Sequence, residues 1–260
     1  MVAWICSLGK SLKAAIAALG FAFLLLFLAI KITLFGKKFD QPVRLRHIIL
    51  ELHASGVQAL PVVILMAGTI GIMLAIQGIH SLAIFGAESQ VTFGLALSIP
   101  REFAPLITGI IVAGRSGSQL ASRVGSMRLN GELDALTAMG IAPARFIVAP
   151  CLIGLMLSLP ILVATANLSA FVAAGLYLDT ALGISPVAYW NDVFIIVSLA
   201  DLAQSFGKAF VFSILISIIS ISKGLSVVGG ADMLGKATTS SVVTCIGSII
   251  VADTVFALLS

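Results

Sequence analysis

SIPREFAPLITGIIVAGR, residues 98–115, is the stretch that decides the fold. It sets Arg101 beside Glu102 inside a run that is otherwise apolar for about the length of a membrane crossing. Ionised side chains at that depth are costly and persist mainly where they face a cavity, a partner or a substrate. The stretch therefore predicts a membrane span with a functional polar centre. The alternative is a plain Arg–Glu pair that holds two helices together.

Two prolines flank this charged pair. Pro105 has no N–H and leaves the carbonyl of Arg101 without its helical donor, and Pro100 does the same to Ala96. Irregular polar backbone is tolerated at membrane depth only where protein or water covers it. The prolines and the charges therefore indicate the same site.

The composition is that of an integral membrane protein. Hydrophobic residues make up 60% of the 260 residues and charged residues 10%, whereas soluble domains are about half apolar and a quarter charged. We expect one membrane domain over residues 1–260. The excess of 15 Lys+Arg over 11 Asp+Glu is modest and lies in particular loops, so we interpret it as topology and expect no nucleic-acid partner. The three cysteines are isolated, and we expect neither a metal nor a cofactor.

Five segments are long and apolar enough to cross a bilayer: residues 55–79, 92–114, 146–178, 193–222 and 238–259. Their connections alternate in charge. Arginines lie in connection 115–145 and lysines in connection 223–237, whereas connections 80–91 and 179–192 contain neither. The positive-inside rule places connections 115–145 and 223–237 in the cytoplasm, and the C-terminus then lies outside.

A sixth apolar run, residues 14–30, has lysines on both sides and would break this alternation if it spanned. We therefore expect an interfacial or re-entrant elbow within residues 1–54, followed by a five-helix core over residues 55–260. An ordinary first span is the alternative.

Small residues recur on two of the predicted spans. Ala67, Gly71 and Ala75 follow one another every four residues, and Ser213 and Ser217 do the same. Such faces let helix backbones approach closely, which favours packing within the subunit. A contact between two copies of the chain is the alternative.

Charged side chains occur in three of the five predicted spans. Beyond the Arg–Glu pair they are Asp201, Lys208 and Asp253, and the amide of Gln77 lies near the outer end of the first span. Several helices would thus contribute to one polar cavity, and the neighbouring walls would be apolar, with residues such as Leu74, Ile84, Phe85 and Leu97. A mixed cavity suits an amphipathic ligand. The alternative is that these groups only neutralise one another for assembly.

The connection between the second and third spans predicts two short amphipathic helices. Apolar residues recur at helical spacing from Leu120 to Met127 and again from Leu133 to Met139, with a break at Asn130 and a stop at Gly140. Such helices dock on the membrane surface or in a partner's groove. The chain contains no nucleotide-binding motif, so a partner would have to supply energy from ATP.

These residues resemble the MlaE (YrbE) family, the permease subunits of ABC transporters that work with MCE-domain lipid-binding proteins. The resemblance covers about residues 55–260 and is densest from Arg101 onward. The family's loop pattern is retained at Gly114, Arg115, Gly117, Ser118, Gly125, Met127, Arg128, Asp134, Ala135, Leu136, Met139, Gly140 and Pro143. The chain departs from the pattern at Arg123, where the family has an acidic residue, at Gly131-Glu132 and at Ala142.

The resemblance implies a homodimeric, non-enzymatic permease in a bacterial inner membrane, with a lipid pocket at the dimer centre. It also implies a cytoplasmic ATP-binding subunit dimer, a STAS-domain subunit and a periplasmic MCE-domain hexamer. The implied role is phospholipid transport that maintains outer-membrane lipid asymmetry.

We expect two sets of site residues on this basis. The lipid pocket or its gate would use Gln77, Phe85, Arg101, Glu102, Lys208 and Asp253. The ATPase-coupling loop would use Arg115, Arg128, Glu132, Asp134, Leu136, Met139 and Gly140. Replacing Arg101 or Lys208 by alanine should impair lipid transfer and leave the complex assembled.

Two other functions remain open at this stage. An ion-coupled secondary transporter would use Asp201, Glu102 and Asp253 as proton sites. A scaffold for envelope assembly would transport nothing.

Overall fold

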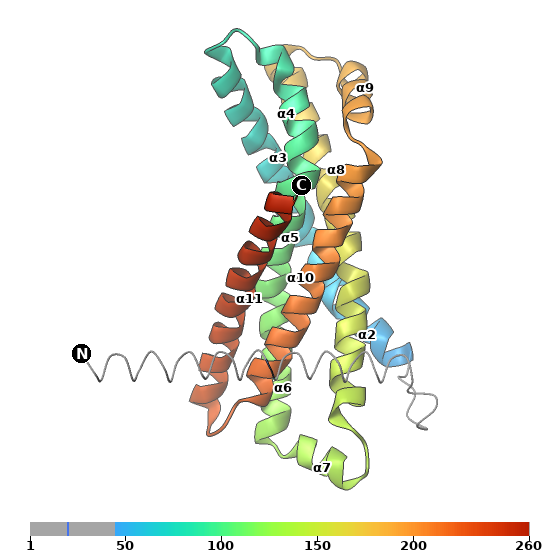
Figure 1. Cartoon of the computed structure of the whole chain (residues 1–260), viewed down its shortest axis with the longest axis vertical. Helices are drawn as coiled ribbons and strands as arrows, with labels where there is room; N and C mark the ends of the chain where they lie inside the picture. Colours follow the sequence, from blue (N-terminus) through green and yellow to red (C-terminus); the bar gives the residue numbers. More distant parts are fainter. Residues whose placement is uncertain (1–19, 21–44, 260) are drawn as a thin grey trace, which may run out of the picture.

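The computed structural model describes residue 20 and residues 45–259. Throughout residues 45–259 the regular elements are helices, and five of them are long and apolar enough to cross a membrane, as predicted. The helices form an elongated bundle (Figure 1). The apolar run at residues 14–30, predicted to form the elbow, lies outside the described residues except for residue 20.

The first span consists of two helices joined by a bend. α2, Leu45–Ser55, leads through the short turn η2, Val57–Ala59, into α3, Leu60–Ala83. Together they extend the apolar segment well before the predicted start at residue 55. Ser55 Oγ donates to the carbonyl of Glu51 at 2.6 Å, which satisfies one carbonyl of the last turn of α2.

The second span is one long helical path interrupted by two wide turns. After η3, Glu88–Gln90, it runs through α4, Val91–Ser98, and α5, Ala104–Val112. The π turn η4, Ile99–Phe103, separates these helices, and a second π turn, η5, Ala113–Gly117, follows α5. In η4 the N–H of Ala104 reaches the carbonyl of Ile99, five residues back. The prolines that flank the charged pair explain this widening, because each removes a backbone donor.

The two helices of the predicted coupling loop have different positions. α6, Ser118–Leu129, continues the second span and packs against the fourth and fifth spans, so it is part of the bundle. This corrects the expectation that residues 120–127 form a short helix docked on the membrane surface or in a partner's groove. Only α7, Glu132–Ala138, is short and separate; it begins after Gly131, whose φ of 72° suits glycine.

The glycines of α6 explain why it packs so closely. A Cβ on Gly125 would lie 2.4 Å from Leu234, and one on Gly117 would lie 3.1 Å from Ser220. From the other side, a Cβ on Gly224 would lie 2.8 Å from Val124. Backbones at this separation leave no room for side chains.

The third span begins at the π turn η6, Ala144–Val148, and continues as α8, Ala149–Leu182. A separate helix, α9, Pro186–Ile196, follows it. The predicted fourth span at residues 193–222 is therefore wrong at its start, because residue 193 belongs to α9. Tyr189 anchors α9, since its hydroxyl donates to the carbonyl of Phe171 at 3.0 Å.

The fourth span is α10, Leu199–Leu225, and the fifth is α11, Ala231–Leu259. Ser198 and Asp201 form a capping box at the start of α10. α7 and the α10–α11 turn lie at one end of the bundle, and the α3–α4 turn and α9 lie at the other (Figure 1). This arrangement agrees with the predicted alternation of the connections.

The small-residue faces pack inside the subunit, as favoured by the sequence. Ala67, Gly71 and Ala75 are buried where α3 meets α8. A Cβ on Gly71 would lie 2.3 Å from the carbonyl oxygen of Ala170. Ser213 and Ser217 are fully buried, and each hydroxyl donates to a carbonyl of its own helix.

Candidate functional site

Lys208 is the centre of a cluster of charged side chains in the middle of the bundle. Its side chain is fully buried on α10. Its Nζ lies 2.9 Å from Glu102 Oε1 on η4 and 2.8 Å from Asp253 Oδ1 on α11. One ammonium group therefore joins the second, fourth and fifth spans.

The ammonium group also satisfies a backbone acceptor. Lys208 Nζ donates to the carbonyl of Arg101 at 2.7 Å. This is the carbonyl from which Pro105 withholds the helical N–H. The ammonium group thus combines one hydrogen bond to a backbone carbonyl with two ion pairs to carboxylates.

A second ion pair adjoins the first. Arg101 Nε lies 2.6 Å from Asp201 Oδ1, and Asp201 Oδ2 accepts from the backbone N–H and the hydroxyl of Ser198 at 2.9 and 2.8 Å. The carboxylate of Asp201 thus caps α10 and holds η4 against the first turn of α10. The simple Arg101–Glu102 pair is not formed, because Arg101 binds Asp201 and Glu102 binds Lys208, both on α10.

The cluster combines three carboxylates with two cations, so its formal charge is −1 when every group is ionised. The burial of these groups is uneven. Lys208, Asp201 and Asp253 are buried, whereas 45% of the Arg101 side chain and 38% of the Glu102 side chain are exposed at the bundle surface.

The exposed charges lie deep in the apolar part of the span. Ten residues of helical path separate Arg101 from Val91 at the start of α4, which is a rise of about 15 Å and half of a ~30 Å hydrocarbon core. Hydrocarbon is a poor environment for a half-exposed guanidinium and carboxylate. Another molecule or a polar chamber must therefore cover this face of the bundle.

The structure brings four of the six predicted pocket residues together and leaves two apart. Arg101, Glu102, Lys208 and Asp253 form the cluster. Gln77 lines a cavity of about 210 Å³ between α3 and α4, together with residues such as Leu74 and Ser98. Phe85 is exposed in the α3–α4 turn, beside the exposed Ile84. The lining of this small cavity does not include the cluster residues.

Asp201 is the member of the charged cluster that the predicted set of pocket residues omits. Its partner in the capping box, Ser198, stands three residues earlier, and that spacing at the start of an apolar run is a sequence signal for a helix N-terminus. Recognising the signal would have moved the start of the fourth span to Leu199 and placed Asp201 at its N-terminal end.

Arg115, predicted to act in the coupling loop, is engaged inside the subunit. Its Nη1 donates to the carbonyl of Ala54 at 3.2 Å, and its Nη2 donates to Gln58 Oε1 at 3.1 Å. It therefore ties η5 to the bend of the first span. A contact with an ATPase stays a prediction for this residue.

The other residues predicted for the coupling loop lie on α7 or next to it in the chain, at the end of the bundle. Arg128 Nη1 lies 3.2 Å from Asp134 Oδ1, and Glu132 accepts a hydrogen bond from Asn130. Leu136 is half-buried, whereas Met139 is exposed just before Gly140, whose φ is 73°. α7 thus presents an acidic surface ending in an exposed methionine.

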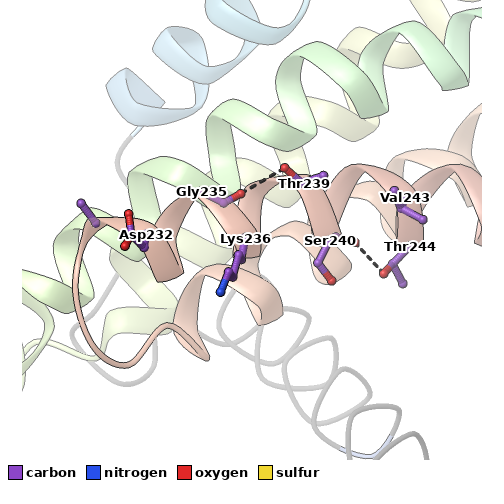
Figure 2. Close-up of a pocket in the computed structure, with 8 residues that line it drawn as sticks. Asp232, Gly235, Lys236, Thr239, Ser240, Val243 and Thr244 are labelled. Carbon is purple, nitrogen blue, oxygen red and sulfur yellow. Dashed lines mark hydrogen bonds between the residues drawn. The ribbon is translucent and has the colours of Figure 1, made fainter.

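α11 has an open groove along its first turns. Figure 2 shows Asp232, Lys236, Ser240 and Thr244 along this groove. The hydroxyls of Thr239 and Thr244 donate to the carbonyls of Gly235 and Ser240, so they are satisfied within the helix. Apart from Asp232 and Lys236, the groove is lined by small side chains.

Comparison with known proteins agrees with this architecture. Residues 48–259 match the family model described as Permease MlaE. The chain is 34% identical over 211 residues to a probable ABC transporter permease protein of Synechocystis sp., covering 80% of this chain and 79% of the relative.

Two further relatives carry more specific names. The chain is 30% identical over 252 residues to the intermembrane phospholipid transport system permease protein MlaE of Haemophilus influenzae, covering 94% of this chain and 92% of the relative. It is 31% identical to the chloroplastic protein TRIGALACTOSYLDIACYLGLYCEROL 1 of Arabidopsis thaliana, covering 80% of this chain and 59% of the relative.

Proposed function

Because the chain belongs to the MlaE permease family, we propose that it is the membrane subunit of an ATP-driven phospholipid transporter in a bacterial inner membrane. The observation that carries this proposal is the half-exposed pair Arg101 and Glu102 at membrane depth. A phospholipid head group offers both signs of charge to such a pair, and its acyl chains suit the surrounding apolar surface.

A second copy of the chain would complete the chamber. α11 is the least buried of the five spanning helices, with 17% of its most apolar window buried. Gly235, Thr239, Val243 and Gly247 recur every four residues on its exposed side. A Cβ on either glycine would meet no atom within 4 Å, so a partner helix could approach closely. In the dimer the paired clusters would face a shared lipid cavity.

ATP hydrolysis would come from a cytoplasmic ATP-binding dimer. α7 supports this assignment, because its acidic residues and the exposed Met139 form a short surface at the end of the bundle. Pushing on α7 would move α6, which is continuous with the second span through η5. Motion would thus reach the charged cluster along one helical path.

The remaining partners follow from the family assignment. Lipid would pass between the central cavity and a periplasmic MCE-domain hexamer, and a STAS-domain subunit would join the ATPase. The transporter would maintain outer-membrane lipid asymmetry. The C-terminus would lie on the periplasmic side, as the charge pattern of the connections predicts.

The test is lipid transfer by the complex purified from native membranes and reconstituted in liposomes. Arg101→Ala should abolish ATP-dependent transfer of a fluorescent phospholipid, while the subunits still co-purify. Arg46→Ala removes an exposed cation outside the cluster and should transfer lipid normally. Transfer at the wild-type rate by Arg101→Ala would remove the cluster from the proposed mechanism.

One observation favours a second candidate. The cluster has three carboxylates and two cations, so a proton on one carboxylate would make it neutral. An ion-coupled transporter would then use Glu102, Asp201 or Asp253. Transport that follows a proton gradient in liposomes lacking the ATP-binding subunit would support this candidate and contradict the first.

A further inference from the structure

The bend of the first span lies beside one of the wide turns of the second span. In the first span, η2 separates α2 from α3, and in the second span, η5 separates α5 from α6. Arg115 lies within η5 and bridges the two places. Its Nη1 donates to the carbonyl of Ala54, in the last turn of α2, at 3.2 Å, and its Nη2 donates to Gln58 Oε1, in η2, at 3.1 Å. One guanidinium group therefore binds the first span on both sides of its bend.

The position of this guanidinium suits the end of a helix. The carbonyl of Ala54 is one of the last four of α2, and such carbonyls lack a donor within their own helix. A cation at this place also complements the negative end of the helix dipole. Arg115 is therefore held at the end of α2 by a hydrogen bond and by charge.

A second contact joins the same two spans farther along. Arg123 Nη2 on α6 lies 2.8 Å from Glu51 Oε2 on α2. Arg115 and Arg123 are eight residues apart on one span, and Glu51 and Gln58 are seven residues apart on the other. Both spacings are about two helical turns, so each pair lies on one side of its span. The two spans thus run in opposite directions and are joined by side chains at two levels.

The turn η5 has the features of a hinge. It is a π turn, and such turns in α-helices are frequent at functional sites. A Cβ added to Gly114 would meet no atom within 4 Å, whereas one added to Gly117 would lie 3.1 Å from Ser220 Oγ on α10. The turn is therefore packed on one side and has open space on the other.

Different parts of the molecule lie on the two sides of the paired bends. On one side, α6 leads to α7. On the other side, α3 of the first span and α4 of the second span line the cavity of about 210 Å³ that contains Gln77. Each of the two spans therefore supplies one wall of this cavity.

We propose that Arg115 is a positioning residue, which makes the bend of the first span follow η5 when α6 is displaced. A push on α7 then reaches both walls of the α3–α4 cavity and not only the wall from the second span. This inference rests on the proposed function, because the push comes from the ATP-binding subunit. Without Arg115 the second span moves alone, and ATP is hydrolysed with little movement of lipid.

The experiment measures ATP hydrolysis and phospholipid transfer in the same liposomes, which contain the complex purified from native membranes. Arg115→Gln should lower the number of lipids transferred per ATP at least about fivefold, the lower end of the coupling between two linked sites. The rate of ATP hydrolysis should stay near that of the wild type. Arg115→Lys keeps the charge and should recover part of the ratio. Arg46→Gln removes an exposed cation of α2 outside the two bends and should match the wild type.

Three outcomes separate the role of Arg115 from the proposed function. A wild-type ratio of lipid to ATP in Arg115→Gln would overturn the positioning role. Loss of the ATP-binding subunit during purification of Arg115→Gln would overturn it too, because Arg115 would then hold that subunit directly. A wild-type complex that transfers no lipid with ATP would instead contradict the proposed function.

A second measurement needs no transport. Amide hydrogen exchange of the purified full-length chain reports how readily each turn opens. Gln58→Leu changes only the first span, yet it should speed exchange in residues 113–117 of the second. Gln90→Leu is the matched control, since it replaces an exposed glutamine in another short turn, η3. Unchanged exchange at residues 113–117 in Gln58→Leu, or equal acceleration by both variants, would overturn the link between the two bends.

Discussion

Lys208 on α10 lies 2.8 Å from Asp253 on α11, and both side chains are buried at membrane depth. The same ammonium group lies 2.9 Å from Glu102 and donates to the carbonyl of Arg101. Removing one member of such a set leaves the others buried without a partner, which costs more than the set contributes when it is complete.

The first prediction concerns the removal of the Lys208 cation from this set. Lys208→Met should lower the free energy of unfolding by about 3–5 kcal/mol, because Glu102 and Asp253 lose their cation. The expectation that Lys208→Ala leaves the complex assembled stays a prediction, which co-purification of the subunits would test. Adding Glu102→Gln and Asp253→Asn should restore most of the stability without restoring lipid transfer. Thermal unfolding of the purified chain measures the stability, and a Lys208→Met midpoint equal to that of the wild type would contradict the prediction.

The second prediction concerns the contact between α3 and α8. Gly71→Ala should destabilise the chain by at least about 2 kcal/mol, because the new Cβ would lie 2.3 Å from a backbone oxygen that no rotamer change can move. Gly207→Ala is the matched control on α10, where an added Cβ meets no atom within 4 Å. It should be neutral or stabilising by up to about 1 kcal/mol. Similar melting temperatures for the two variants would argue against the close packing.

The third prediction concerns Arg123, where the family pattern has an acidic residue. Arg123 Nη2 lies 2.8 Å from Glu51 Oε2 and 3.0 Å from Cys151 Sγ. Arg123→Glu should destabilise the chain by about 1 kcal/mol or more, because two carboxylates would then meet. Adding Glu51→Arg should recover most of the loss. A double mutant no more stable than Arg123→Glu would show that the charge pair does not join α2 to α6.

A control for this pair lies on the same helix. Arg128 also binds a carboxylate, Asp134, but the Asp134 side chain is 75% exposed, whereas the Glu51 side chain is 12% exposed. Reversing the charge of Arg128 should change the stability by less than about 0.5 kcal/mol.

The fourth prediction concerns alkaline pH. Burial raises the pKa of the Tyr189 phenol, whose hydroxyl donates to the carbonyl of Phe171. The folded chain therefore holds this proton more tightly than the unfolded chain, and stability should fall as the pH rises above about 10, the ordinary pKa of tyrosine. Tyr189→Phe should flatten this part of the curve of melting temperature against pH. An identical alkaline slope in the variant would exclude Tyr189 as its source.

Local patterns explain why much of the fold could be predicted. Spans are set by the length of apolar segments, so five were evident, and Gly131 and Gly140 marked the ends of α7 through backbone conformations that suit glycine. The α9–α10 boundary was missed because residues 193–197 are as apolar as the span itself. Only the Ser198–Asp201 cap separates the two helices.

The sequence by itself determined that the chain crosses a membrane and that charges lie in its spans, because hydrophobicity and chain position are local properties. It also located the carbonyl of Arg101 that Pro105 leaves without a donor. Only the tertiary structure decided the partners: Arg101 pairs with Asp201, and Lys208 pairs with Glu102 and Asp253. Each pair joins residues of two different elements that are far apart in the sequence. Their geometry therefore depends on how the helices pack.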